Sequence, residues 1–341
     1  MKFAQHSASH SLIIGMAAVL AACGGGGGGA SGTTGNSFAA SSITSANMQD
    51  VGAQGYSATS NLNAQVGGST SGFITDVSVE AAAAGIPGAA LQGLYRALQA
   101  QAGASQVVGI TVTETIPCAA GGSMAVTATI ASAGAISAGD NFAINASACK
   151  EPRFTLNGKF NVTFKSLSGE PGQSAWSGAL AIAYTDFSVS GGGAATASAT
   201  GDMSINVNQT AFGAASFAVT GKSLKLDAAH NGATDTVTLS NFSYGGSLKS
   251  GTYTYNANFG LTGNLSKLGD VNLAVKTLTD FKQTGLSFPY QGVLKVTATD
   301  NSSVTLTVVN NSSVTLDLDK NGDGAIDETV NTTWTALASR L

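Results

Sequence analysis

The sequence contains few charged residues and has no excess of basic ones. Only 10% of its 341 residues are Asp, Glu, Lys or Arg, whereas soluble domains carry about 25%. The formal net charge is −4. Nucleic-acid binding needs clustered Lys and Arg to displace counterions from the phosphates. The composition therefore argues against a nucleic-acid partner.

Histidine is also scarce, which limits the chemistry available to the chain. Of three histidines, His6 and His10 lie near the N-terminus, and His230 precedes Asn-Gly, a hairpin-turn signal that places it at a solvated loop tip. The sequence contains no Gly-x-Ser-x-Gly nucleophile elbow. Glu114 is the one glutamate within a clear strand pattern, and nothing pairs it with the second acid that a glycosidase needs. We expect no catalytic residues, no enzyme activity and no required cofactor.

A short apolar segment near the N-terminus ends in a cysteine. Residues 12–20 are apolar and follow a basic Lys2. This segment is shorter than the roughly 20 apolar residues that span a bilayer, and it is typical of a secretory signal. It ends in Leu20-Ala21-Ala22-Cys23, which resembles the lipobox of bacterial lipoproteins.

The lipobox resemblance implies where in the cell the protein is located. In that family the signal is cut before the cysteine, which carries a diacylglycerol and an amide-linked acyl chain such as palmitate. Residues 1–22 would then be a signal peptide and Cys23 the lipidated first residue, with two or three acyl chains in a membrane. Gly24 follows the cysteine where Asp would favour inner-membrane retention, so the resemblance implies the outer membrane, on either its periplasmic or its surface face.

The segment after the lipobox divides into a tether and a helical part. A run of glycines opens residues 23–40, which we interpret as a flexible tether because such a segment cannot bury apolar area. We expect residues 41–104 to form a helical N-terminal segment, with one helix over 43–66 and Thr44 or Ser45 as its cap. A second helix is expected from near Pro87 to about residue 102. Its apolar stripe comprises Leu91, Leu94, Tyr95 and Leu98.

From residue 105 to the end, the apolar pattern has a period of two. Val108, Ile110 and Val112 alternate with Gly and Thr, and similar runs separated by Gly, Asn and Asp continue to Trp334. Because no clear helix divides these runs, parallel crossover units are not expected. We predict a mainly β fold with one or two N-terminal helices: an antiparallel meander that hides its edges as a barrel or as a sandwich. A membrane-spanning barrel would need aromatic girdles, and aromatics total only 7%.

Two cysteines remain after Cys23. Cys118 and Cys149 lie at the ends of expected strands, without Cys-x-x-Cys spacing or a nearby histidine. An exported protein meets an oxidising environment, so we predict a disulfide. A loop of about 30 residues closed in this way contributes roughly 3–4 kcal/mol in the chain-entropy model.

One acidic segment near the C-terminus has the spacing of a metal loop. From Asp319 the chain resembles the calcium loop of EF-hand and dockerin proteins, with glycine at position six and an apolar residue at position eight. Val330 stands where the bidentate Glu would be, and strands are expected on both sides. The segment can therefore be interpreted either as a site for a structural calcium ion or as a plain polar hairpin. The expected ligands would be Asp319, Asn321, Asp323, Asp327 and the Ala325 carbonyl.

These observations leave two main functions open. The first is a membrane-anchored envelope lipoprotein with a non-enzymatic structural or interaction role. The second is a carrier or binding module that holds an apolar ligand in a curved sheet, and a hydrolase is less well supported. The expected partner is the membrane through the lipid anchor, with an envelope protein or an apolar ligand unidentified.

Overall fold

The computed structural model describes most of the chain after residue 41. The described residues are 42–69, 90, 94, 111–130, 136–151, 154–169, 174–191, 196–230, 233–285 and 287–341. All of them belong to one compact unit, residues 37–341. Residues 1–41, which include the expected signal peptide, Cys23 and the whole of the expected tether, lie outside the described residues.

The secondary structure is dominated by strands, as the period-two pattern predicts. The elements in chain order are α1 (Met48–Ser69), β1 (Thr111–Pro117), β2 (Ser123–Thr129), β3 (Asn141–Lys150), β4 (Phe154–Ser168), β5 (Trp176–Gly191), β6 (Thr196–Ala211), β7 (Ala214–His230), β8 (Ala233–Lys249), β9 (Thr252–Leu265), β10 (Gly269–Thr284), β11 (Gln291–Ala298), β12 (Ser303–Val308), β13 (Ser313–Asp319), β14 (Glu328–Thr333) and α3 (Trp334–Ala338).

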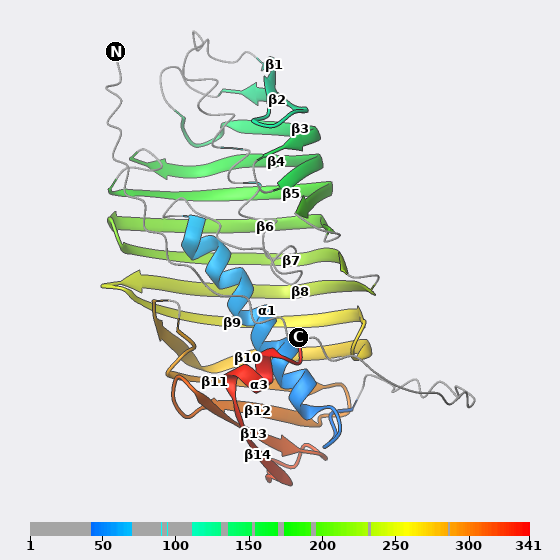
Figure 1. Ribbon diagram of the computed structural model, residues 1–341. Helices are drawn as coiled ribbons and strands as arrows, with labels where there is room; N and C mark the ends of the chain where they lie inside the picture. The colour runs from blue at the N-terminus through cyan, green and yellow to red at the C-terminus, as the bar shows by residue number, and fades with distance from the viewer. Residues whose placement is uncertain are drawn as a thin grey trace, which may run out of the picture. The chain divides into compact units, whose positions relative to one another are not determined.

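The fourteen strands of the described residues form one sheet in chain order, from β1 to β14 (Figure 1). Each strand pairs antiparallel with the next. The prediction of an antiparallel meander is therefore confirmed. Antiparallel neighbours need no crossover connection, so the chain can pass directly from each strand to the next.

The two faces of the sheet differ sharply in composition. In β6, for example, Met203 and Ile205 are buried, whereas Ser204 and Asn206 are exposed. Successive side chains of a strand point to opposite faces, so this alternation sorts the whole sheet. We call the buried, apolar face the inner face and the exposed, polar face the outer face.

Helix α1 lies on the inner face and contacts strands β7, β8, β9, β11, β12 and β13 (Figure 1). Its sequence has glycines where the helix meets the sheet. A Cβ added at Gly55 would lie 2.6 Å from Val296 Cγ2, and one at Gly52 would lie 3.0 Å from Leu316 Cδ2. Glycine thus lets the helix backbone approach the strands closely. The predicted first helix is confirmed, although it begins at Met48 rather than at residue 43.

Of the residues in the predicted second helix, the structure describes two. Ala90 and Leu94 are both helical and both buried in the core. They are one helical turn apart and so share a face, and Leu94 belongs to the apolar stripe predicted for this helix. Leu91, Tyr95 and Leu98 lie outside the described residues.

A short C-terminal helix, α3, joins the end of the sheet to α1. The Thr333 hydroxyl accepts a hydrogen bond from Ala336 N and caps the helix. Trp334 is buried, with its ring centroid 4.5 Å from that of Tyr56. Arg340 forms an ion pair with Asp50 at 3.0 Å. The sequence pattern did not predict this helix.

The sheet is not closed, so the barrel alternative is wrong. Among the described residues, β1 pairs only with β2 and β14 only with β13. One cause lies in β1, where Glu114 is opposite Val126 and therefore on the inner face, yet remains exposed. A charge directed inward on an edge strand disfavours pairing with a further strand.

Neither described helix combines the length and the apolar character needed to cross a bilayer.

Candidate functional site

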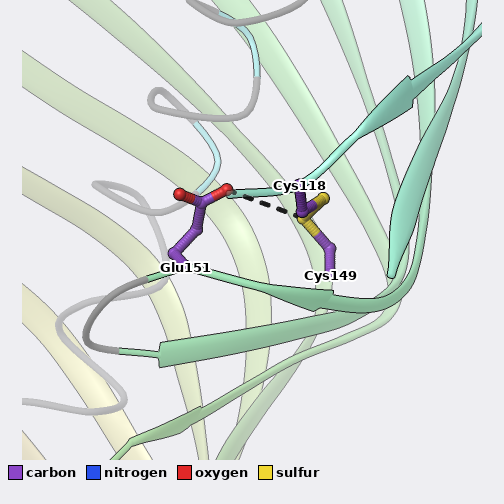
Figure 2. A group of neighbouring side chains, drawn as sticks. All are labelled: Cys118, Cys149 and Glu151. Atoms are coloured by element: carbon purple, nitrogen blue, oxygen red, sulfur yellow. Dashed lines mark hydrogen bonds between the residues drawn. A yellow bond between two sulfur atoms is a disulfide. The ribbon is translucent and has the colours of Figure 1, made fainter. Parts of the chain in front are cut away.

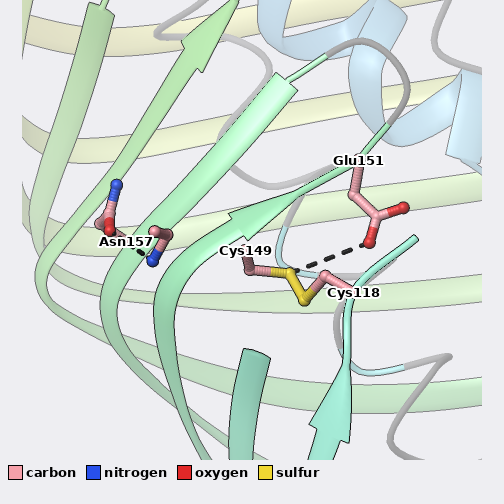
Figure 3. Close-up of a disulfide and its surroundings, with 5 residues drawn as sticks. Cys118, Cys149, Glu151 and Asn157 are labelled. Carbon is pink, nitrogen blue, oxygen red and sulfur yellow. Dashed lines mark hydrogen bonds between the residues drawn. A yellow bond between two sulfur atoms is a disulfide. The ribbon is translucent and has the colours of Figure 1, made fainter. Parts of the chain in front are cut away.

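The predicted disulfide between Cys118 and Cys149 is present at one end of the sheet (Figures 2 and 3). The two Cα atoms are 5.3 Å apart, within the predicted limit of about 7 Å. Cys118 follows β1 and Cys149 lies near the end of β3, so the bond spans the intervening strand β2. It ties the first hairpin of the sheet to the third strand.

A β-bulge directs Cys149 toward the interior. Regular alternation after Phe142, Ile144 and Ala146 would leave Cys149 on the outer face, but the β3–β4 register shifts between Ala146 and Cys149. Ala148 takes the extra position with φ 44°. The bulge leaves Cys149 fully buried, a reorientation that bulges commonly produce.

Side-chain and backbone contacts hold this bulge in place. Asn157 Oδ1 accepts a hydrogen bond from Ala148 N at 2.8 Å (Figure 3). The turn after β1 adds two backbone bonds, from Ala120 N to Lys150 O at 2.9 Å and from Lys150 N to Gly121 O at 2.7 Å. These hydrogen bonds hold the backbone on either side of Cys149, at Ala148 and Lys150.

Glu151 lies beside the disulfide, with its Oε1 atom 3.8 Å from Cys149 Sγ (Figure 2). A disulfide sulfur carries no proton, so this contact is not a hydrogen bond. Among the described residues, Cys118, Cys149 and Glu151 are the one group of three side chains close enough to hold a metal ion. Metal binding at cysteine requires thiolates, and here the two sulfurs are bonded to each other. The group is a structural crosslink.

The acidic hairpin forms a network of side-chain to backbone hydrogen bonds. The Asp319 carboxylate accepts from Gly322 N at 2.7 Å and from Gly324 N at 3.0 Å. Asp323 accepts from Ala325 N at 2.8 Å, and Asp327 accepts from Lys320 N at 2.6 Å. Each carboxylate thus satisfies backbone donors of the turn, as Asp and Asn commonly do.

The loop's electrostatics follow from these bonds. Hydrogen bonds from Ala325 N and the Asn321 side chain lower the pKa of the Asp323 carboxyl. Within the loop, which is fully described, Asp319, Asp323 and Asp327 do not form a group with oxygens within 4.8 Å of one another. Calcium binding there remains a prediction, because bringing these oxygens around one ion would require the loop to rearrange.

His230 and the glutamates of the first and last strands lie far apart along the sheet. His230 ends β7, and its side chain lies outside the described residues. Glu114 lies on β1 at one edge of the sheet and Glu328 on β14 at the other. The Ser45 hydroxyl donates a hydrogen bond to Glu328 and lowers the pKa of its carboxyl. Glu114 and Glu328 therefore lie at opposite edges of the sheet, too far apart to act as a catalytic pair.

The outer face carries a feature that the sequence did not reveal. One row of register partners crosses all fourteen strands. From β1 to β14 it comprises Thr111, Thr129, Asn141, Thr163, Ala181, Ser204, Thr220, Ser243, Asn258, Lys276, Lys295, Thr305, Asp317 and Thr329. We call this set the polar row. Period-two alternation indicates which residues face outward, but only the strand register shows which of them are neighbours.

The fold and the crosslink define a class: a disulfide-tied, open antiparallel β-meander with its N-terminal helix on the inner face. No known family model, curated protein or solved structure matches the chain.

Proposed function

We propose that this chain is a lipid-anchored protein of the bacterial cell envelope with a non-enzymatic structural or interaction role. The anchor rests on Leu20-Ala21-Ala22-Cys23 behind a short apolar segment. The interaction role rests on the different composition of the two faces of the sheet. The inner face builds the core, while the outer face presents polar groups to solvent.

The observation that carries the interaction role is the polar row. Thirteen of its fourteen members carry hydroxyl, amide, ammonium or carboxylate groups, Ala181 being the exception. Neighbouring strands are about 4.8 Å apart, so the row is a regularly spaced line of hydrogen-bonding groups. An extended outer face of this kind suits contact with another polar surface.

The anchor is tested by the substitution Cys23→Ser. The wild-type chain should incorporate a radiolabelled fatty acid and sediment with membranes, whereas the variant should do neither. A Cys118→Ser/Cys149→Ser double variant is the matched control and should remain labelled. A wild-type chain that incorporates no fatty acid would remove the basis of the proposal.

The interaction role is tested by placing a photo-crosslinking amino acid at single positions in the full chain. Ser204 in the polar row should give one discrete crosslinked product in the living cell. Phe212, at the exposed turn after β6, is the control and should not give it. Equal crosslinking from both positions, or none from Ser204, would contradict a role for the outer face.

One buried hydroxyl group favours a second function, in which the protein carries an apolar ligand. The Tyr244 hydroxyl is buried on the inner face of β8 without a hydrogen-bond partner among the described residues. The Tyr56 and Tyr255 hydroxyls, in contrast, bond to each other at 3.1 Å. Burial raises the pKa of Tyr244, so this hydroxyl is neutral and can donate to a ligand oxygen.

Lipid extraction from the purified full-length chain, followed by mass spectrometry, distinguishes the two functions. If the chain is a carrier, an apolar molecule should co-purify in near-stoichiometric amount and decrease in Tyr244→Phe. If the role is structural, nothing should co-purify. In that case Tyr244→Phe should raise stability by about 1–3 kcal/mol, because it removes an unsatisfied buried hydroxyl.

A further inference from the structure

Two lysines are opposed on the outer face of the sheet. Lys276 of β10 and Lys295 of β11 are direct register partners and adjacent members of the polar row. Their strand neighbours Val275, Leu294 and Val296 are buried on the inner face, so both lysines point outward. Lys276 is exposed and Lys295 is half-buried.

This arrangement places like charges together in a chain with few charges. Directly opposed side chains of an antiparallel pair have Cβ atoms about 4.5–5.5 Å apart, and like charges there are destabilising. Among the described residues, neither lysine forms an ion pair. Their mutual repulsion is therefore not relieved by a carboxylate of the described chain.

Two carboxylates in this part of the sheet accept hydrogen bonds from other residues. Asp317 is in the same row but two strands beyond Lys295, and it accepts a hydrogen bond from the Thr329 hydroxyl at 2.7 Å. Asp280 lies in the irregular part of β10 and accepts from Asn256 Nδ2 at 3.2 Å.

The members of the polar row on either side of the lysine pair also offer hydrogen-bond donors. Asn258 on β9 and Thr305 on β12 lie on either side of the lysine pair. Amide and hydroxyl groups can both donate hydrogen bonds, so the four residues present donors at successive strand spacings. Two ammonium groups with donors on both sides match the several oxygens and the negative charge of a phosphate group.

We propose that Lys276 and Lys295, flanked by Asn258 and Thr305, form a binding site for a phosphate group on the outer face. The group can belong to inorganic phosphate or to the headgroup of an anionic lipid. Binding places a negative charge between the two ammonium groups and removes their repulsion.

The first arm of the test uses inorganic phosphate and the full-length chain in neutral detergent. Phosphate should raise the melting temperature more than chloride does at equal ionic strength, because it binds the native state. Lys276→Gln and Lys295→Gln should each weaken phosphate binding about tenfold, as loss of one charged hydrogen-bonding group predicts. Lys159→Gln is the matched control, since Lys159 is exposed on β4 and faces Asn145 and Thr185.

The second arm uses vesicles and the full-length Cys23→Ser chain, so that acyl chains do not cause attachment. Phosphatidylglycerol vesicles should bind it more tightly than phosphatidylcholine vesicles, and Lys295→Gln should abolish the difference. Binding of vesicles without an effect of inorganic phosphate identifies a lipid headgroup. The reverse result identifies a soluble phosphate.

A charge reversal separates binding from a general salt effect. Lys295→Glu should raise the melting temperature in chloride, because it replaces repulsion by a cross-strand ion pair, and should lose the additional effect of phosphate. The proposal is overturned if neither arm shows phosphate dependence, or if phosphate dependence survives in both glutamine variants.

Discussion

Gly55 of α1 lies so close to Val296 of β11 that a Cβ on the glycine would be 2.6 Å from the valine Cγ2 atom. This contact joins a helix at the start of the chain to a strand near its end. A glycine within a helix usually lowers stability by roughly 0.5–1 kcal/mol relative to alanine. At this position we expect the opposite, because alanine would clash with the sheet.

Gly55→Ala should therefore destabilise the protein despite its better helix propensity. We expect a loss of about 1–3 kcal/mol, the range for overpacking a well-packed core. Chemical denaturation measures it. Val296→Ala in the same chain should restore part of the loss, since it removes the methyl group that the new Cβ meets. Additive effects of the two substitutions would show that the contact does not limit how the helix packs.

Removal of the disulfide should lower stability without changing the fold. Cys118 and Cys149 are 31 residues apart in sequence, and closing a loop of that length contributes roughly 3–4 kcal/mol in the entropic model. A Cys118→Ser/Cys149→Ser double variant should show this loss in urea titration. Wild type with the disulfide reduced should match it, and a much smaller loss in both would indicate that the edge hairpin remains ordered without the crosslink.

Acid should weaken the attachment of the N-terminal segment to the β11–β12 turn. Burial opposes ionisation of Asp300, but hydrogen bonds from the Ser302 hydroxyl at 2.6 Å and backbone N–H at 2.9 Å outweigh it and hold the pKa below its usual range. Ser302 Oγ in turn accepts from Ile43 N at 2.6 Å.

The sign of this pH dependence follows from linkage. A carboxyl with a lowered pKa in the folded state stabilises that state above its unfolded pKa, which is about 3.9 for Asp. The contribution is lost as the pH falls through the folded value. Wild type should lose stability more steeply than Asp300→Asn as the pH falls from about 5. Parallel melting curves for both proteins over that range would contradict the assignment.

Calcium should raise the melting temperature if the acidic loop binds it. Asp323→Ala should then abolish the rise while changing the calcium-free melting temperature little, because Asp323 is exposed. Asp317→Ala, on the adjoining strand, is the control and should retain the rise. A wild-type melting temperature unmoved by millimolar calcium would leave the loop as a polar hairpin.

The sequence predicted the fold in outline because its main signals are local. Alternation such as Val126 and Ala128 on one face of β2 requires only the geometry of a strand. The disulfide prediction also needed no long-range information, because it followed from the cysteine count and from the expected oxidising compartment. The bulge at Ala148, which turns Cys149 inward, depends on Asn157 and on the turn at Gly121. No local pattern records such contacts.

The candidate phosphate site illustrates a different limit. Lys276 and Lys295 are each ordinary outward residues of a strand, and nothing in the sequence between them fixes their pairing. Their opposition depends on the register of β10 and β11, which includes two irregularities beyond Thr277. Likewise, Trp334 continues an apparent strand pattern and begins α3 instead. The capping hydroxyl of Thr333 and the contact with Tyr56 favour the helix.

The position of α1 has a consequence for the order in which the chain can fold. The hairpins between successive strands are local and can form as soon as each pair of strands exists. Helix α1 comes first in the sequence, yet the bond from Ile43 N to Ser302 Oγ spans 259 residues. Because α1 packs on β11, β12 and β13 as well as on β7, β8 and β9, its complete binding surface exists only after the late strands have been synthesised. Until then, part of the apolar surface of the helix and of the inner face remains exposed. Such exposed apolar surface makes the incomplete chain prone to aggregation during this interval.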